Sequence, residues 1–299
     1  MIKLFHYIIS SSASEGFDQI KMLLIIEALL LISAALEQGH RAAAEGLIYP
    51  FNMALNSVDD QYDGCTEEMA HLVMTEYLQK ELNNSAAFKM AWQEAENNTS
   101  APEDDLTENH LIAIYVYTDK EVYREFNNAV RREKEKYKNM TYPWFSLHFL
   151  LTEAIQLLKK TQEGCKSTYR GTDVEFDRDV LNAEVRFGSF TSSSLNRTVA
   201  EGFGNVFCFE IYTCEGAEVA NYSKFPDEDE VLIPPYETFK VTAVRNRTDQ
   251  NDLWCETVFT LESSGKISDL NCRLFNTANH VAGFSVLIIL TSFCKMFTC

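Results

Sequence analysis

Three short segments in the second half of the chain contain residue types that could do chemistry. The first, Tyr169-Arg170-Gly171, places a guanidinium beside a glycine, and a glycine allows a ligand to approach the backbone closely. An arginine in such a place can bind a phosphate group through two parallel hydrogen bonds. Taken alone, however, an ordinary surface arginine is the simpler interpretation of Arg170.

The second segment is a run of hydroxyl side chains, Thr191-Ser192-Ser193-Ser194, that follows Phe190. These hydroxyls can bond their own backbone and shape a turn, or they can bond an amide or a ribose of a ligand. No histidine lies nearby in the sequence, so the run gives no local support for a serine nucleophile of the triad type. By itself the run is read more simply as an ordinary turn.

The third segment is an acidic run, Asp227-Glu228-Asp229-Glu230, which leads directly into the apolar residues 231–233. Because side chains alternate faces in an extended segment, Glu228 and Glu230 are expected to point the same way. Paired carboxylates suit a reaction through an oxocarbenium-like ribosyl cation, where one stabilises the cation and the other handles the nucleophile. The simpler interpretation of the run alone is a solvated edge strand whose charges discourage aggregation.

The elements that must position these segments change in character near residue 164. Helical periodicity predicts helices over residues 67–93, 108–137 and 144–161, and Pro143 stands where proline commonly opens a helix. The later pattern is shorter and alternating, and it predicts strands over residues 166–169, 184–190, 206–214, 230–233, 239–244 and 258–261. We therefore expect an α+β fold, with an N-terminal helical layer packed on an antiparallel β-sandwich that carries the site.

The composition indicates a folded and acidic protein. The 299 residues include 44 acidic and 26 basic side chains, a formal net charge of −18, and 46% of them are hydrophobic. Such a chain can bury a sizeable core, which argues against a disordered protein. The charge argues against nucleic-acid binding, because phosphates require a basic face. The cysteines and histidines lack metal-ligand spacing, so we expect no metal.

Both ends of the chain have the composition of targeting segments. We expect residues 1–39 to comprise an upstream extension and a secretory signal, because a short apolar run follows Lys21-Met22 and ends in small residues. Glu27 interrupts that run, and a buried helix is the alternative. Residues 277–299 form a hydrophobic terminus with almost no charge. This end favours a removable tail that directs a glycosylphosphatidylinositol (GPI) anchor over a spanning helix or an uncleaved secreted terminus.

Residues between these ends support secretion independently. Seven Asn-x-Ser/Thr sequons predict a glycosylated surface: Asn83, Asn97, Asn98, Asn139, Asn196, Asn221 and Asn246. An even set of cysteines, Cys65, Cys165, Cys208, Cys214, Cys255 and Cys272, predicts disulfides formed in an oxidising compartment. Fifteen pairings of six cysteines remain open on arithmetic alone. The protein is therefore expected at the outer face of the plasma membrane or, alternatively, in secreted form.

In combination, an arginine, a serine and a Glu-x-Glu pair on separate strands resemble the arginine–serine–glutamate signature of the ADP-ribosyltransferases. Residues 164–171, 185–195 and 228–239 are similar to the three blocks of that signature. Residues 123–131 and 147–158 are similar to the vertebrate ecto-enzymes of the family. The resemblance covers about residues 53–274, which implies a catalytic domain with a helical part, 53–163, and a β-rich part, 164–274.

This resemblance implies a role for each matching residue. Arg170 and Gly171 would bind the phosphate side of NAD, and Ser192 would position the nicotinamide–ribose end. Glu230 would be the catalytic carboxylate that bonds the ribose 2′-hydroxyl as nicotinamide leaves. Glu228 would orient the acceptor arginine, since a glutamate at this place resembles the arginine-specific members and a glutamine goes with NAD hydrolysis.

The implied activity is transfer of ADP-ribose from NAD to arginine on extracellular or cell-surface proteins, by a monomer without a metal. Two alternatives stay open: an NAD glycohydrolase with water as the acceptor, and a catalytically silent cell-surface binding module. The family's common disulfides would correspond to Cys65–Cys272 and Cys165–Cys214. Cys208 and Cys255 are then left as a candidate third pair.

Overall fold

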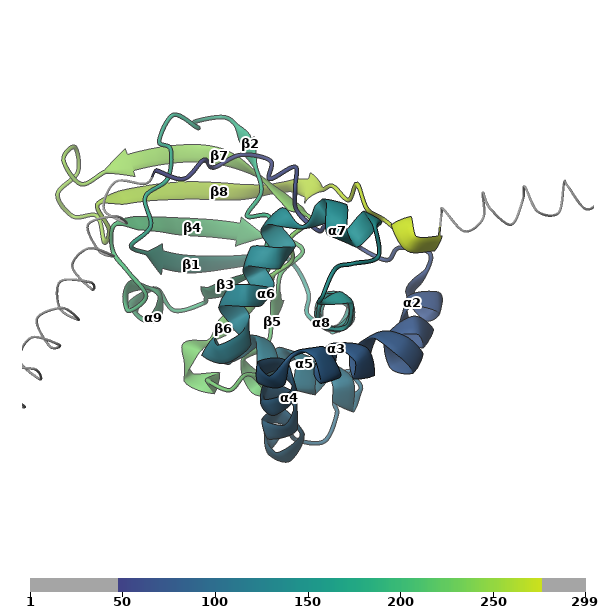
Figure 1. Cartoon of the computed structure of the whole chain (residues 1–299). Helices are drawn as coiled ribbons and strands as arrows, with labels where there is room; N and C mark the ends of the chain where they lie inside the picture. Colours follow the sequence, from purple (N-terminus) through teal and green to yellow (C-terminus); the bar gives the residue numbers. More distant parts are fainter. Residues whose placement is uncertain (1–47, 276–299) are drawn as a thin grey trace, which may run out of the picture. The chain divides into compact units, whose positions relative to one another are not determined.

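The computed structural model describes residues 48–275, and helices precede strands along this part of the chain (Figure 1), which confirms the α+β class. The targeting segments expected at residues 1–39 and 277–299 lie outside the described residues. The helical half contains α2 (Thr66–Leu72), η1 (Val73–Tyr77), α3 (Leu78–Asn84), α4 (Ala86–Asn98), α5 (Glu108–Thr118), α6 (Lys120–Arg132), α7 (Lys134–Lys138) and α8 (Phe145–Thr161). Between residues 48 and 275 no helix combines the length and apolar character needed to cross a bilayer.

Two of the predicted helices are divided by residues that cap the next helix. At Ser85 the backbone turns extended, with ψ 109°, and the side chain accepts a hydrogen bond of 3.2 Å from the Phe88 amide, which starts α4. Asp119 does the same for α6, accepting from the Glu121 amide at 3.3 Å. Serine and aspartate favour such positions because their oxygens satisfy amides that have no partner within the helix. Apolar spacing continues across both residues, so the single helix predicted over 108–137 is wrong.

The strand half contains β1 (Lys166–Thr172), β2 (Glu184–Val185), β3 (Thr191–Ser194), β4 (Phe207–Thr213), β5 (Ala217–Glu218), β6 (Glu230–Ile233), β7 (Glu237–Asn246) and β8 (Thr257–Lys266). Three short helical turns interrupt it, namely α9 (Arg197–Glu201), η2 (Ala220–Tyr222) and η3 (Pro226–Glu228). The strand predicted over 184–190 is too long, because only residues 184–185 form a strand, β2, which pairs with β7 at the sheet edge. The hydroxyl run that the sequence alone predicts as a turn forms the next strand, β3, between β1 and β6.

The sheet differs in detail from the expected antiparallel β-sandwich. Its strands form one hydrogen-bonded series in the order β2-β7-β8-β4-β1-β3-β6-β5, and the β4–β8 pair is parallel. Figure 1 shows β7, β8, β4 and β1 side by side, whereas β6 and β5 run steeply across that direction. An alternating pattern reveals that a strand has a buried face, but it does not encode the direction of the neighbouring strand.

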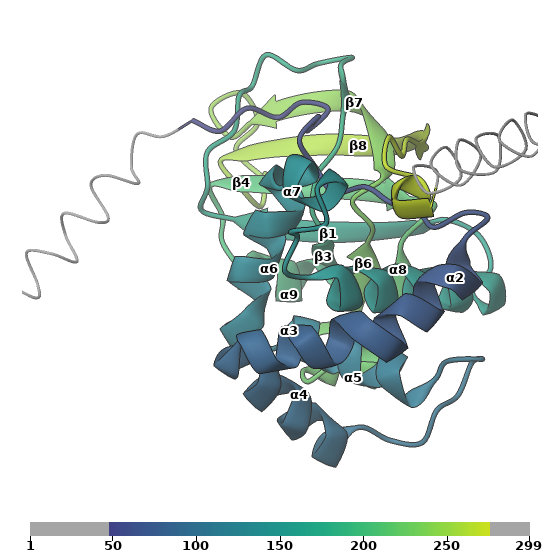
Figure 2. The same cartoon turned by 45° about the vertical axis from the view of Figure 1, so that its right-hand side comes forward.

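Two large hydrophobic cores and a small third cluster, around the Cys208–Cys255 disulfide, support this arrangement. The largest core lies among the helices and extends to Phe190 and Leu232 beside the β3–β6 pair. The second core lies on the sheet and contains stacked aromatic rings, such as Phe209 and Phe259, whose centroids are 5.5 Å apart. Figure 2 shows α2, α3, α4 and α5 gathered below the β7–β8–β4–β1 part of the sheet. The short strands β3 and β6 therefore lie where the helical core meets the sheet.

Three disulfides connect parts of the described chain that are distant in sequence. They are Cys65–Cys272, Cys165–Cys214 and Cys208–Cys255. The first joins residues 207 positions apart, at the start of α2 and beyond β8. In the chain-entropy model, closing loops of these lengths stabilises the fold by ~3–5 kcal/mol each.

Candidate active site

The three sequence segments meet on neighbouring strands of the sheet. Tyr169 of β1 pairs with Ser194 of β3, and Ser194 pairs in turn with Glu230 of β6. Nη1 of Arg170 donates a hydrogen bond of 2.6 Å to the carbonyl oxygen of Ser192. Arg170, Ser192 and Glu230 all line one cavity of about 550 Å³. Sheet register therefore brings together side chains that are up to 60 positions apart in the sequence.

Glu228 lines the same cavity, but the reason is not the alternation of side chains along an extended strand. Residues Pro226–Glu228 form a 3₁₀ turn, and Asp229 adopts a left-handed backbone with φ 47° before β6 begins at Glu230. The premise of an extended acidic run is therefore wrong, although both glutamates line one cavity. Two hydrogen bonds fix the kink: the Ser194 hydroxyl donates to the Glu228 carbonyl at 2.7 Å, and the Leu195 amide donates to the Asp229 carbonyl at 3.0 Å.

Glu230 is a buried carboxylate, and burial disfavours its ionised form. Only 4% of the residue is exposed, and this burial raises its pKa to about 7. The Glu228 carboxylate raises the pKa of Glu230 further, whereas hydrogen bonds from Ser192 and Ser223 and the charge of Arg170 oppose the shift. A buried carboxylate at such a site gains more than an exposed one when positive charge develops beside it.

Arg170 is half-buried, and tyrosines surround its guanidinium. Burial opposes its charged form, but Tyr123, Tyr117 and Glu230 outweigh that cost, so the pKa of Arg170 lies above its ordinary value. The guanidinium therefore stays charged inside the cavity, where an anionic phosphate would be less screened than at the surface.

The helical half contributes cavity residues to which sequence reasoning assigned no role. Tyr117 and Thr118 come from the end of α5, and Tyr123 and Arg124 come from the start of α6. Tyr117 is buried, hydrogen-bonded to Ser192, and accepts a bond of 3.2 Å from Asn127. The helical period does not separate these tyrosines from core residues, and the break at Asp119 is what turns them towards the cavity.

Gly171 has a structural reason for lacking a side chain. A Cβ at this position would lie 2.3 Å from the Gly204 carbonyl oxygen and 2.4 Å from that of Ala200. Only glycine allows α9 and its following turn to pack so closely on β1. The same turn places Phe203, 56% exposed, in the cavity wall. Over the described residues 48–275, no group of side chains could hold a metal ion.

Comparisons with known proteins agree over most of the chain. Residues 51–266 match the family model described as NAD:arginine ADP-ribosyltransferase. The erythroblast NAD(P)(+)–arginine ADP-ribosyltransferase of Gallus gallus is 35% identical over 261 residues, covering 83% of this chain and 84% of the relative. The T-cell ecto-ADP-ribosyltransferase 2 of Mus musculus is 39% identical over 251 residues, covering 79% and 82%. The GPI-linked NAD(P)(+)–arginine ADP-ribosyltransferase 1 of Mus musculus is 34% identical over 271 residues, covering 82% of each chain.

Solved structures give the same result. A mutant of the eukaryotic mono-ADP-ribosyltransferase ART2.2, crystallised in complex with NADH, superposes with a TM-score of 0.64 at 34% sequence identity. That alignment covers 75% of this chain and 98% of the ART2.2 chain. A second ART2.2 mutant, in complex with NAD, has a TM-score of 0.62 at 33% identity with the same coverage.

Proposed function

The chain belongs to the NAD:arginine ADP-ribosyltransferase family and transfers ADP-ribose from NAD to arginine, and we propose that Arg170, Ser192, Glu228 and Glu230 carry this reaction. One observation carries the assignment of residues: side chains from β1, β3, β6 and η3 converge on a single cavity. The catalytic domain comprises residues 53–274, with the helical part 53–163 forming one wall of the site and the strand part 164–274 the other.

Arg170 and Gly171 hold the phosphate side of NAD. The Arg170 guanidinium stays charged in the cavity, and Gly171 lines the same wall, where its missing side chain allows α9 and the following turn to pack against β1. Ser192 positions the nicotinamide–ribose end, since its hydroxyl already bonds both Glu230 and Tyr117. Holding the dinucleotide in this way reduces the loss of entropy on the way to the transition state.

Glu230 stabilises the charge that develops when nicotinamide leaves. The bond between the ribose anomeric carbon and the nicotinamide nitrogen breaks with its electron pair on nicotinamide, which leaves a ribosyl cation. The Glu230 carboxylate bonds the ribose 2′-hydroxyl beside this cation. Because Glu230 is buried and Arg170 and Ser192 fix the remainder of the site, the carboxylate favours the transition state, in which positive charge moves from the nicotinamide ring to the ribose, over the ground state.

Glu228 orients the acceptor. Protein arginine is protonated near neutrality, so its nitrogen can attack the anomeric carbon only if a proton leaves as the new bond forms. Glu228 lies at the cavity wall, partly exposed, where an incoming guanidinium can form an ion pair with it and lose that proton to it. Water as the acceptor would need no such partner, which is the distinction between a transferase and a glycohydrolase.

Labelled NAD, incubated with the purified ectodomain and a small guanidino acceptor, tests these roles. Glu228→Gln is expected to lose arginine transfer while nicotinamide release continues, because only acceptor capture needs the second carboxylate. If E228Q transfers as well as wild type, the role given to Glu228 is wrong. Absence of nicotinamide release from wild type would instead favour a silent binding module.

Cell-surface attachment is the second part of the proposal. We infer that the mature protein is a monomer held at the outer face of the plasma membrane by a GPI anchor directed by residues 277–299. One relative is named as GPI-linked and another as an ecto-enzyme. Within the described chain, the sequon asparagines Asn83, Asn97, Asn98, Asn139, Asn196 and Asn221 are exposed. Residues 1–39 supply the signal for secretion, and extracellular proteins with accessible arginines are the acceptors.

A phosphatidylinositol-specific phospholipase, added to cells expressing the full chain, checks the anchor. Enzyme activity is expected to move from the cells into the medium. Activity in the medium without phospholipase would support the secreted alternative, and activity that stays on the cells after treatment would contradict the anchor. Light scattering of the released protein tests the monomer.

A further inference from the structure

One loop carries most of the acceptor side of the cavity. Residues 219–229, which connect β5 to β6 and are called the acceptor loop below, contribute Phe225 and Glu228 to the cavity lining. Ser223 of the same loop bonds the Glu230 carboxylate. A loop that holds the proposed acceptor-orienting group needs its own attachment, because Glu228 is not part of a strand.

Lys224 attaches this loop to the helical half. Its Nζ lies 2.8 Å from Oε1 of Glu94 in α4 and 2.8 Å from Oδ2 of Asp119, between α5 and α6. The backbone amide of Lys224 also donates a bond of 3.0 Å to the Thr118 hydroxyl. The ammonium lies 5.7 Å from the centroid of the Tyr115 ring. The hydrogen bonds to Asp119 and Glu94 raise the pKa of Lys224 above its ordinary value, so Lys224 is charged at neutral pH. The two ion pairs of Lys224, with Glu94 and with Asp119, are called the clasp below.

Asp119 has a second function that connects the two sides of the cavity. Its side chain also accepts the Glu121 amide and caps α6, the helix that supplies Tyr123 and Arg124 to the cavity. A single carboxylate therefore fixes both the start of the NAD-facing helix and the acceptor loop. Glu94, by contrast, contacts the acceptor loop through Lys224 and does not cap α6.

The two reacting carboxylates depend on the clasp to different degrees. Glu230 belongs to β6 and is bonded by Ser192 of β3, so the sheet holds it. Glu228 belongs to the acceptor loop, outside the strands, and its carbonyl accepts from the Ser194 hydroxyl. Loosening the loop should therefore disturb acceptor capture more than the departure of nicotinamide.

We propose that Lys224 is a positioning residue that holds the acceptor loop so that Glu228 faces an incoming arginine, and that it thereby sets the share of ADP-ribose transferred to arginine rather than to water. This inference rests on the proposed function. A nucleophile must be held close to the atom that it attacks, and a displacement of about 1 Å can slow the reaction strongly. A loosened acceptor loop therefore loses transfer to arginine, while hydrolysis by water continues.

Two substitutions at Lys224 test the inference through the ratio of transfer to hydrolysis. Nicotinamide release is measured without an acceptor, and transfer is measured over a range of agmatine concentrations. Lys224→Met should lower the ratio about three- to tenfold, chiefly through a higher KM for agmatine, because partly exposed ion pairs are individually weak. Hydrolysis should keep its KM for NAD and its kcat. Lys224→Arg should restore the ratio, since guanidinium can contact both carboxylates.

Ionic strength gives a readout that loss of packing alone would not move. Salt screens partly exposed ion pairs, so the wild-type ratio should fall as salt is raised. The K224M ratio should fall less steeply over the same range, because only the ion pair between Glu228 and the acceptor remains to be screened. Glu94→Gln removes one of the two contacts and should give an intermediate ratio.

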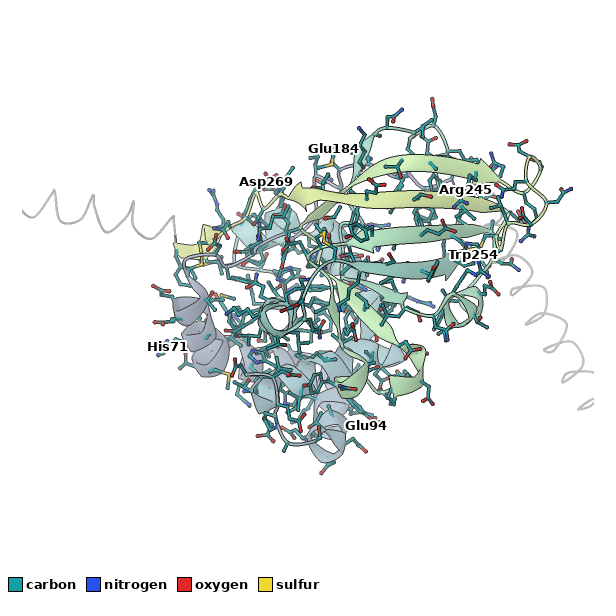
Figure 3. All side chains as sticks on the ribbon, turned by 180° about the vertical axis from the view of Figure 1, so that it is seen from behind. His71, Glu94, Glu184, Arg245, Trp254 and Asp269 are labelled. Atoms are coloured by element: carbon teal, nitrogen blue, oxygen red, sulfur yellow. A yellow bond between two sulfur atoms is a disulfide. The ribbon has the colours of Figure 1, made fainter. Side chains whose placement is uncertain are left out.

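Lys134→Met provides a matched control. Lys134 of α7 forms a similar ion pair, 2.7 Å from Asp269, and likewise connects the helical half to a later segment. Figure 3 shows Asp269 and Glu94 at opposite ends of the molecule, so this pair is far from the acceptor loop. K134M should lower the melting temperature without changing the ratio.

A wild-type ratio in K224M would overturn the inference, and so would an equal fall of transfer and hydrolysis. Failure of the proposed function has a separate signature: wild type would release nicotinamide without transferring ADP-ribose to agmatine or to any arginine peptide.

Discussion

Glu81 in the helical half and Glu230 in the strand half are both buried, and comparing them shows what distinguishes the proposed catalytic carboxylate from a structural one. Glu81 in α3 is 6% exposed, and burial raises its pKa to about 8. Glu230 in β6 is 4% exposed, and burial raises its pKa to about 7. Burial and pKa therefore do not separate the two residues.

Their partners do separate them. Oε2 of Glu81 accepts the Ser146 amide at 3.1 Å near the start of α8, so this carboxylate satisfies the open end of a helix. Glu230 instead shares its cavity with Arg170, Ser192 and Glu228, three groups of complementary chemistry. A perturbed pKa is evidence of a reaction site only where other functional groups converge on the same space.

The largest expected effect comes from neutralising each glutamate. Glu230→Gln should lower both nicotinamide release and arginine transfer by about 10³-fold, since a charge-stabilising group at a reacting centre commonly contributes that much. Glu81→Gln should leave both rates within about twofold, because the amide oxygen can still accept the Ser146 amide. Initial rates at saturating NAD measure both variants. Equal losses in E230Q and E81Q would show that burial, and not the cavity, matters.

A second pair of variants compares the half-buried Arg170 with the buried Arg186. Arg170 faces the cavity, whereas Arg186 forms a buried ion pair with Asp59 at 2.8 Å and donates to backbone carbonyls. Arg170→Lys should raise the KM for NAD about tenfold or more with little change in melting temperature, because lysine cannot make a two-pronged phosphate contact. Arg186→Lys should lower stability by about 3 kcal/mol while the folded fraction keeps its KM for NAD.

Thermal unfolding and kinetics of the two variants decide this comparison. An unchanged KM for NAD in R170K would remove Arg170 from the phosphate site. A raised KM in R186K would mean that the buried ion pair also shapes the cavity, which the present geometry does not predict.

The pH dependence of hydrolysis sharpens the comparison within wild type. Because the ionised form of Glu230 is the reactive one and its pKa is about 7, kcat/KM for NAD should rise up to tenfold per pH unit below pH 7 and level off above it. Nicotinamide release between pH 5.5 and 9 gives the profile. E81Q should show the same profile, and a profile that is flat below pH 7 would contradict the assignment.

The same pKa shifts also predict an effect of pH on stability. Both glutamates have a higher pKa folded than unfolded, so each favours the folded state less as pH rises from about 4.5 to its folded pKa. E81Q and E230Q should therefore be close to wild type near pH 4.5, and at pH 9 they should exceed it by roughly 5 and roughly 3 kcal/mol, respectively. Denaturant unfolding at both pH values checks this. A difference in unfolding free energy between variant and wild type that is largest at pH 4.5 would contradict the predicted direction of the pH effect.

The sequence was a better guide to which side chains share a cavity than to the elements that position them. Arg170, Ser192 and Glu230 were identifiable because each lies in a short run of unusual composition, and all three line one cavity. Glu228 reached the cavity for a different reason from the one expected, since the left-handed Asp229 kink depends on bonds to β3 that local pattern cannot reveal.

The remaining differences have tertiary causes. Helix breaks at Ser85 and Asp119 depend on single capping side chains within a continuous apolar pattern. The parallel β4–β8 pair depends on where a distant strand enters the sheet. Tyr117 and Tyr123 resemble core aromatics in the sequence, and only the packing of α5 and α6 against β1 and β3 gives them a role at the cavity.

The most direct test of the account is a crystal structure of the E230Q protein with NAD bound. We predict that the pyrophosphate contacts Arg170 and that the ribose anomeric carbon lies beside residue 230, with Glu228 facing it from the acceptor loop. NAD bound in another place, or bound in this cavity with its glycosidic bond turned away from residue 230, would contradict the account.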